Sequence, residues 1–190
     1  ASDVSKRHPR GSVPVMTTLP DGRRIPPLTA DEPAMLASWL DMHRATLAVK
    51  CAGLDDEQTL RTPVEPSALS LFGLVQHLAE VERNWIQRVF ARRDVPWIFA
   101  GERGGFTVDR SRTFTEVVAV WEREVAVNRE ICAGRSLDET GRLGPEEAAV
   151  VGGDDAVSLR WILIHLIEEY ARHNGHADLL RERIDGVTGA

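Results

Sequence analysis

The stretch SLRWILIHLIEEYARHNGHADLLRERIDG, residues 158–186, decides the fold class. Its apolar residues recur every three to four positions, which is the period of an α-helix that buries one face. Ser158 is suited to cap the start of this helix and Gly186 to end it. Residues 165–176 nevertheless hold three histidines and two glutamates. Burying an unpaired polar group costs on the order of a few kcal/mol, so this cluster needs a chemical explanation.

Three other segments show the same helical period. Thr29 and Glu32 have the spacing of a capping box at the start of the first, and Thr113 and Glu116 have it at the start of the third. No stretch alternates strongly enough to predict a β-strand. Four helices joined by long connections predict an all-α four-helix bundle. The three segments are about residues 29–53, 67–92 and 113–134.

The connections and the start of the chain are predicted to lie outside the helices. Prolines keep residues 1–28 extended, as an N-terminal arm ahead of a single domain over residues 29–190. Met16 is a candidate natural start, so residues 1–15 either belong to a longer start or are foreign to the protein. The loop that follows the second helix carries Trp97, Ile98 and Phe106, which we expect to pack over a site.

Composition excludes several classes of function. The chain has 190 residues, 43% of them hydrophobic, and a net charge of −6. This charge argues against nucleic-acid binding, which needs a basic surface. We find no apolar run long enough to span a membrane and no signal peptide, and therefore expect a cytoplasmic protein. Cys51 and Cys132 are far apart and are expected to be free thiols.

One internal repetition links two of the helices. SLFGLVQHLAEVER, residues 70–83, matches residues 158–172 in register, so that Ser70 aligns with Ser158 and His77 with His165. Two capped amphipathic helices can look alike by chance. The alternative is that the bundle consists of two related halves, each made of two helices, with pseudo-two-fold symmetry between them.

The histidines and glutamates of the last helix have the spacing of metal ligands. Residues four apart are nearly aligned on a helix, so His165, Glu169 and His173 form one row, with His176 close to it. A site needs a further ligand from elsewhere, and His77 lies at the edge of the apolar face of its own helix. Spacing alone permits three ligand pairs on the last helix: His165 with Glu169, Glu169 with His173, or His173 with His176.

Residues 70–83 and 158–186 together resemble the DinB-like superfamily, and within it the actinobacterial branch of mycothiol-dependent maleylpyruvate isomerase and thiol S-transferases. The likeness covers about residues 17–187. It implies a four-helix bundle that holds a divalent metal, zinc or nickel, and often forms a homodimer. The ligand positions carried over are His77, Glu169 and His173. The isomerase resemblance also implies a further C-terminal domain that this sequence does not contain, so we expect the metal and the thiol but not isomerisation.

The ligand set has a chemical consequence. Two histidines and one carboxylate leave at least one coordination position open, as in catalytic rather than structural zinc sites. In the thiol-dependent relatives a low-molecular-weight thiol takes this position, and the dication stabilises its thiolate. The resemblance therefore implies a metal-dependent, mycothiol-like S-transferase whose metal-bound thiolate attacks a small electrophile. A metal-dependent hydrolase and a non-catalytic metal-binding protein of stress response or interaction remain as alternatives.

Other residues are expected to support this centre. His165 and His176 are candidates to contact the substrate or to orient the ligands. Arg83 is a candidate to hold a carboxylate of the thiol. We expect Trp85 and Trp161 to belong to the core.

Overall fold

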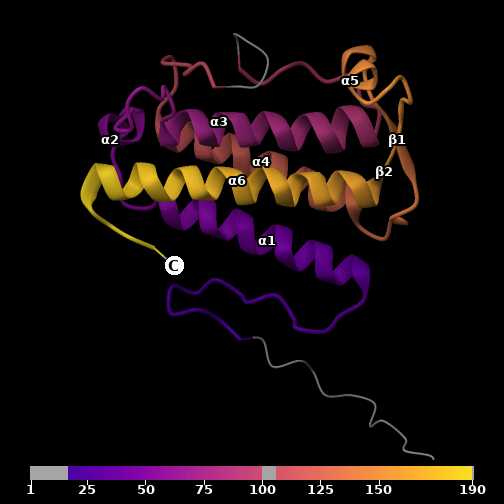
Figure 1. Cartoon of the computed structure of the whole chain (residues 1–190), viewed down its shortest axis with the longest axis horizontal. Coiled ribbons are helices and arrows are strands. Elements are labelled where there is room, and N and C mark those ends of the chain that lie inside the picture. Colours follow the sequence, from indigo (N-terminus) through magenta and orange to yellow (C-terminus); the bar gives the residue numbers. More distant parts are fainter. Residues whose placement is uncertain (1–16, 100–105, 190) are drawn as a thin grey trace, which may run out of the picture.

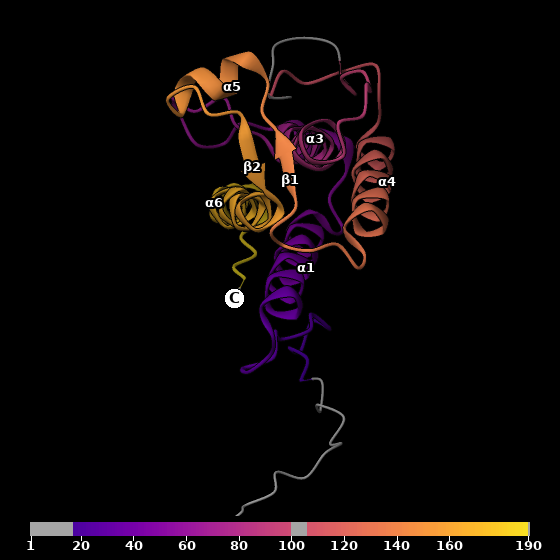
Figure 2. The ribbon, with the colours of Figure 1, turned by 90° about the vertical axis from the view of Figure 1, so that its right-hand side faces the viewer.

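Four long helical segments dominate the structure, a computed structural model that describes residues 17–99 and 106–189 (Figure 1). Seen end-on, α6, α3, α4 and α1 surround one interior (Figure 2). The predicted helical bundle is therefore confirmed, whereas the expectation for residues 1–15 lies outside the described residues. The four segments are α1 (Glu32–Cys51), α3 (Leu71–Glu82) continued by the π-helix η1 (Arg83–Phe90), α4 (Phe114–Cys132) and α6 (Leu159–Asp185).

The helix ends follow local capping chemistry. The Ser70 hydroxyl accepts a hydrogen bond from the Gly73 amide at the start of α3, and Ser158 caps α6 in the same way. The predicted capping box at Thr113 is present. The one predicted at Thr29 is wrong, because α1 starts two residues later, where Asp31 accepts from the Ala34 amide and a proline fits the first turn.

Short elements occupy the connections. The structure corrects the prediction that the chain lacks strands: β1 (Thr140–Arg142) pairs antiparallel with β2 (Ala156–Ser158), and each is too short to show alternation. The strands frame α5 (Pro145–Val150), and α2 (Asp56–Leu60) precedes α3. β1 lies against η1 so closely that a Cβ on Gly141 would be 2.4 Å from the Val89 carbonyl oxygen.

The core takes apolar residues from every long helix. Leu47, Leu78, Val117 and Leu166 are each at most 1% exposed. Both cysteines are free thiols, as predicted. Within residues 17–99 and 106–189, no helix combines the length and apolar character needed to cross a membrane.

A buried polar network crosses this core. Arg44 of α1 donates two hydrogen bonds of 2.8 Å to the carboxylate of Glu82 on α3, which is 0% exposed. Asn128 of α4 and Tyr170 of α6 also donate to this carboxylate, at 2.7 and 2.8 Å. Trp121 completes the set by donating to the Tyr170 hydroxyl at 2.7 Å. One carboxylate thus joins all four helices.

Candidate metal centre

Three side chains from two helices converge beside this core. His77 Nε2 of α3 lies 3.4 Å from Glu169 Oε2, and His173 Nε2 lies 3.3 Å from the same oxygen. Both histidines are buried and Glu169 is half-buried. The structure therefore brings His77 to the Glu169–His173 pair, one of the three pairs that the spacing permitted.

The donor set fits a divalent cation. One ligand atom from each of the three residues lies within 4.8 Å of the other two. Zinc bonds of about 2.0–2.2 Å place tetrahedral ligand atoms about 3.4 Å apart, which is close to the two distances to Glu169 Oε2. The pKa of Glu169 lies far below its usual range, because His173 and His77 approach this carboxylate. The carboxyl group is therefore an anionic donor over the whole physiological range.

His176 touches the far side of this cluster. Its Nδ1 lies 3.2 Å from Nδ1 of His173, one helical turn away. If His173 uses Nε2 as a ligand, its Nδ1 carries the proton and donates it to His176. Burial chiefly lowers the pKa of His176, which favours the neutral imidazole that can accept this bond. His176 thus lies where it can fix the tautomer and ring orientation of His173.

His165 lies on the other side of Glu169. Its Nε2 is 3.6 Å from Glu169 Oε1, so the two oxygens of this carboxylate face different histidines. The ring stacks on Trp161 at a centroid distance of 5.0 Å and contacts Trp85 at 4.4 Å. Trp161 is 44% exposed, so the prediction that it belongs to the core is wrong. Trp85 is half-buried and packs against the core, as predicted, and the two tryptophans together form an aromatic wall next to the candidate metal centre.

The segment before α4 covers the cluster. The sequence predicted that this loop packs over a site but not which contacts hold it there. Phe106 stacks on the His77 ring with centroids 4.1 Å apart and an interplanar angle of 15°. Gln76, the buried neighbour of His77, holds this segment: its amide accepts from the Asp109 amide at 2.9 Å and donates to the Thr107 carbonyl. A glutamine inside an apolar run was the signal available in the sequence, because buried amides require partners.

Arg83 has partners within the protein. Its guanidinium donates to both carboxylate oxygens of Glu124 on α4, at 2.6 and 2.9 Å, and to the Pro96 carbonyl at 3.1 Å. This side chain therefore connects η1 to α4 and to the loop that follows η1. These contacts give no support to the prediction that it holds a carboxylate of the thiol.

Comparisons with known proteins agree with this architecture. A family model described as mycothiol-S-transferase matches residues 35–186, which confirms the predicted DinB-like resemblance. A solved structure described as a conserved protein from Enterococcus faecalis is similar in fold, with a TM-score of 0.58 and 14% identity. The similarity covers 84% of this chain and 100% of that one. No curated protein matches the chain.

Proposed function

Because the chain belongs to the mycothiol-S-transferase family, we propose that it is a metal-dependent enzyme that transfers a low-molecular-weight thiol to a small electrophile. The observation that carries this proposal is the convergence of His77, Glu169 and His173 around one point. Two imidazoles and one carboxylate leave room for a further ligand on the cation, as catalytic sites require. Zinc suits this donor set, and nickel is the second candidate.

Each residue of the centre has a separate task in this proposal. His77, Glu169 and His173 would hold the cation, and His176 would keep His173 in the tautomer that binds it. When bound, the dication lowers the pKa of a coordinated thiol, so that the nucleophilic thiolate exists near neutral pH. Phe106 covers one side of His77 and so limits the access of water.

The thiol has to come from outside the protein. Burial raises the pKa of Cys51 to about 12 and that of Cys132 to about 11. Both groups are therefore protonated at neutral pH, and a protonated thiol is a poor nucleophile. This supports a thiol cosubstrate, as the name of the family implies.

The proposal is tested by metal content and thiol dependence together. His77→Ala and His173→Ala should each abolish stoichiometric zinc in elemental analysis while keeping the helical circular-dichroism signal. Glu169→Gln should weaken zinc binding, because it removes the only anionic donor of the cluster. Glu182→Gln is the matched control, since this carboxylate is exposed on the same helix and belongs to neither group of potential metal ligands found among the described residues, whereas Glu168 forms one with His165 and Glu169. Unchanged zinc stoichiometry in both histidine variants would refute the ligand assignment.

The cobalt-substituted protein separates the alternatives. With mycothiol added, we expect a sulfur-to-cobalt charge-transfer band and transfer to an electrophile that depends on the thiol. Turnover of an ester or amide without any thiol would favour a hydrolase. A bound metal whose absorption spectrum no added thiol changes would favour the hypothesis of a non-catalytic metal-binding protein. A homodimer and a cytoplasmic location stay predictions, and light scattering tests the first.

A further inference from the structure

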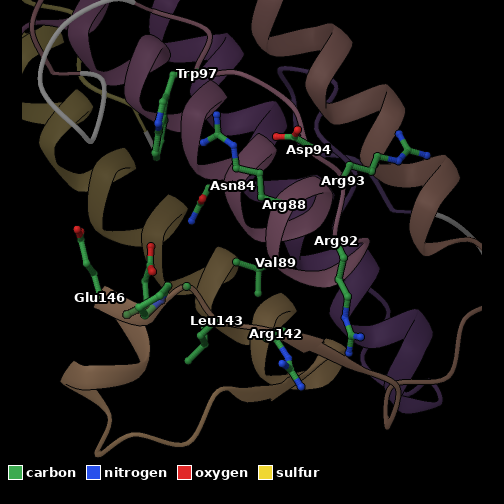
Figure 3. Close-up of a pocket in the computed structure, with 13 residues that line it drawn as sticks. Asn84, Arg88, Val89, Arg92, Arg93, Asp94, Trp97, Arg142, Leu143 and Glu146 are labelled. Atoms are coloured by element: carbon green, nitrogen blue, oxygen red, sulfur yellow. The ribbon is translucent and has the colours of Figure 1, made fainter.

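A groove runs along α3 and η1, on the far side of Trp85 from His165 and the candidate metal centre. Two adjoining cavities, of about 320 and 600 Å³, form it and share Asn84 and Trp97 in their walls. The smaller one is also lined by Trp85, whose ring contacts His165 beside Glu169. The groove therefore begins at Trp85, which one histidine ring separates from Glu169, and ends between η1 and the segment that enters α5 (Figure 3).

The floor of the groove is a polar row on one helix. Glu80, Asn84 and Arg88 are spaced four residues apart, and all three line the cavities. Arg88 lies eleven residues beyond His77, which corresponds to roughly 15 Å along the helix. A molecule whose sulfur lies at the metal centre thus reaches this row with a tail of ordinary small-molecule length.

Two atoms of this row are buried and have no partner among the described residues: Glu80 Oε2 and Arg88 Nη1. The rest of each side chain is fixed. Glu80 Oε1 accepts from the amides of Ile98 and Phe99, at 2.7 and 2.9 Å. Arg88 Nε donates to a carbonyl at 2.9 Å, and its guanidinium lies 3.8 Å from the ring centroid of Trp97. One acceptor and one donor are therefore held in place, and buried groups of this kind require partners.

Asn84 adds a further donor and acceptor between these two atoms. It is half-buried, and its side chain enters none of the hydrogen bonds found within residues 17–99 and 106–189. Figure 3 shows it beside Arg88 and Trp97. Charged groups of both signs surround the row. These groups are Arg92, Arg93, Arg142, Asp94, Glu146 and Glu147.

We propose that this groove binds the tail of the thiol cosubstrate, and that Glu80, Asn84 and Arg88 are the residues that select it. Tail groups that donate and accept would satisfy these three side chains together, while the faces of Trp85 and Trp97 cover the carbon skeleton of the tail. The inference rests on the proposed function only for the identity of the thiol. It assigns thiol selectivity to η1, away from the metal ligands.

Binding to metal-free protein tests the groove without turnover. The probe is S-methyl mycothiol, which keeps the tail and has no free thiol, measured by isothermal titration calorimetry. Asn84→Ala and Arg88→Gln should each weaken its binding about tenfold. The matched controls are Glu122→Gln and Arg123→Gln on the exposed side of α4, which should bind like the parent protein. If Arg88→Gln fails to fold, Asn84→Ala still decides, because the Asn84 side chain makes no hydrogen bond within the described residues.

Kinetics and a charged competitor complete the test. With zinc-loaded enzyme, Asn84→Ala should raise the KM for mycothiol and lower the preference for mycothiol over cysteine about tenfold. Normal transfer with unchanged KM and unchanged probe binding in both groove variants would mean that water alone fills the groove; the inference then fails and the proposed function stands. Equal binding of S-methyl glutathione, whose tail differs from that of mycothiol and carries two carboxylates, would overturn the assignment of thiol selectivity to this groove. If the protein has no transferase activity but binds the probe, and the groove variants weaken this binding, the inference about the groove is supported and the proposed function is refuted.

Discussion

Replacing Arg44 by methionine should destabilise the protein strongly. The substitution removes two charge-assisted hydrogen bonds of 2.8 Å and leaves the Glu82 carboxyl group at 0% exposure without its cationic partner. Breaking a buried ion pair in this way costs about 3–5 kcal/mol. For a domain of this size each kcal/mol lowers the melting temperature by about 2–4 °C, so the loss should be about 6–20 °C. Tyr170 and Asn128 would still donate to the carboxylate, which favours the lower half of this range.

The assay is thermal and guanidinium unfolding followed by circular dichroism. Arg129→Met is the control, because Arg129 pairs with Asp41 on the surface and exposed pairs contribute less than about 1 kcal/mol. The double variant Arg44→Met/Glu82→Met should be more stable than Arg44→Met alone, since no uncompensated charge stays buried. A loss below about 1 kcal/mol for Arg44→Met would refute the reasoning, because the pair would then contribute no more than a surface contact.

Three further predictions concern packing, thiols and pH. Gly141→Ala should destabilise the protein by about 1–3 kcal/mol, because its Cβ would meet the backbone of η1. Gly175→Ala should stabilise α6 by about 0.5–1 kcal/mol, because its Cβ would have open space among the described residues. Chemical denaturation measures both changes in the free energy of unfolding, and equal effects would contradict the packing of β1 on η1. Cys51 and Cys132 should react with iodoacetamide at pH 8 only after unfolding, because burial raises the pKa of both, and rapid labelling of the native protein would contradict this. Burial also raises the pKa of Tyr170 far above that of an unfolded tyrosine, so the folded state keeps its proton longer and stability should fall as pH rises past about 10. Tyr170→Phe should lessen this alkaline loss, and an unchanged slope against pH would count against the assignment.

The long helices were predictable because two independent signals agree in α3, α4 and α6, whereas in α1 the apolar period was right and the predicted capping box at Thr29 was wrong. Apolar periodicity marks the buried face, and a capping residue such as Ser70 or Ser158 marks the start. The short strands were not, since three residues cannot display a period of two. Whether β1 forms depends on its contact with η1, where only glycine fits at position 141, and this contact is far away in sequence.

For the site, spacing identified the ligand types but could not choose among the pairs. The choice depends on how α6 is rotated toward His77, which tertiary packing decides. The same limit explains Arg83, whose partner Glu124 lies on another helix, 41 residues away. Trp161 was misplaced for a related reason: a large apolar residue on an amphipathic helix fits the buried face or the edge of a site equally well.

The pairing of β1 with β2 has a practical consequence for protein engineering. The two strands form a stem anchored on the bundle, and the 13 residues between them, 143–155, leave the stem and return to it. Apart from Leu143 and Ala148, which pack into the core, the residues of this insert can be exchanged while the stem and the helices stay intact. Libraries confined to them would vary the walls of both cavities and leave the candidate metal ligands untouched, which makes the insert a suitable place to evolve new binding preferences.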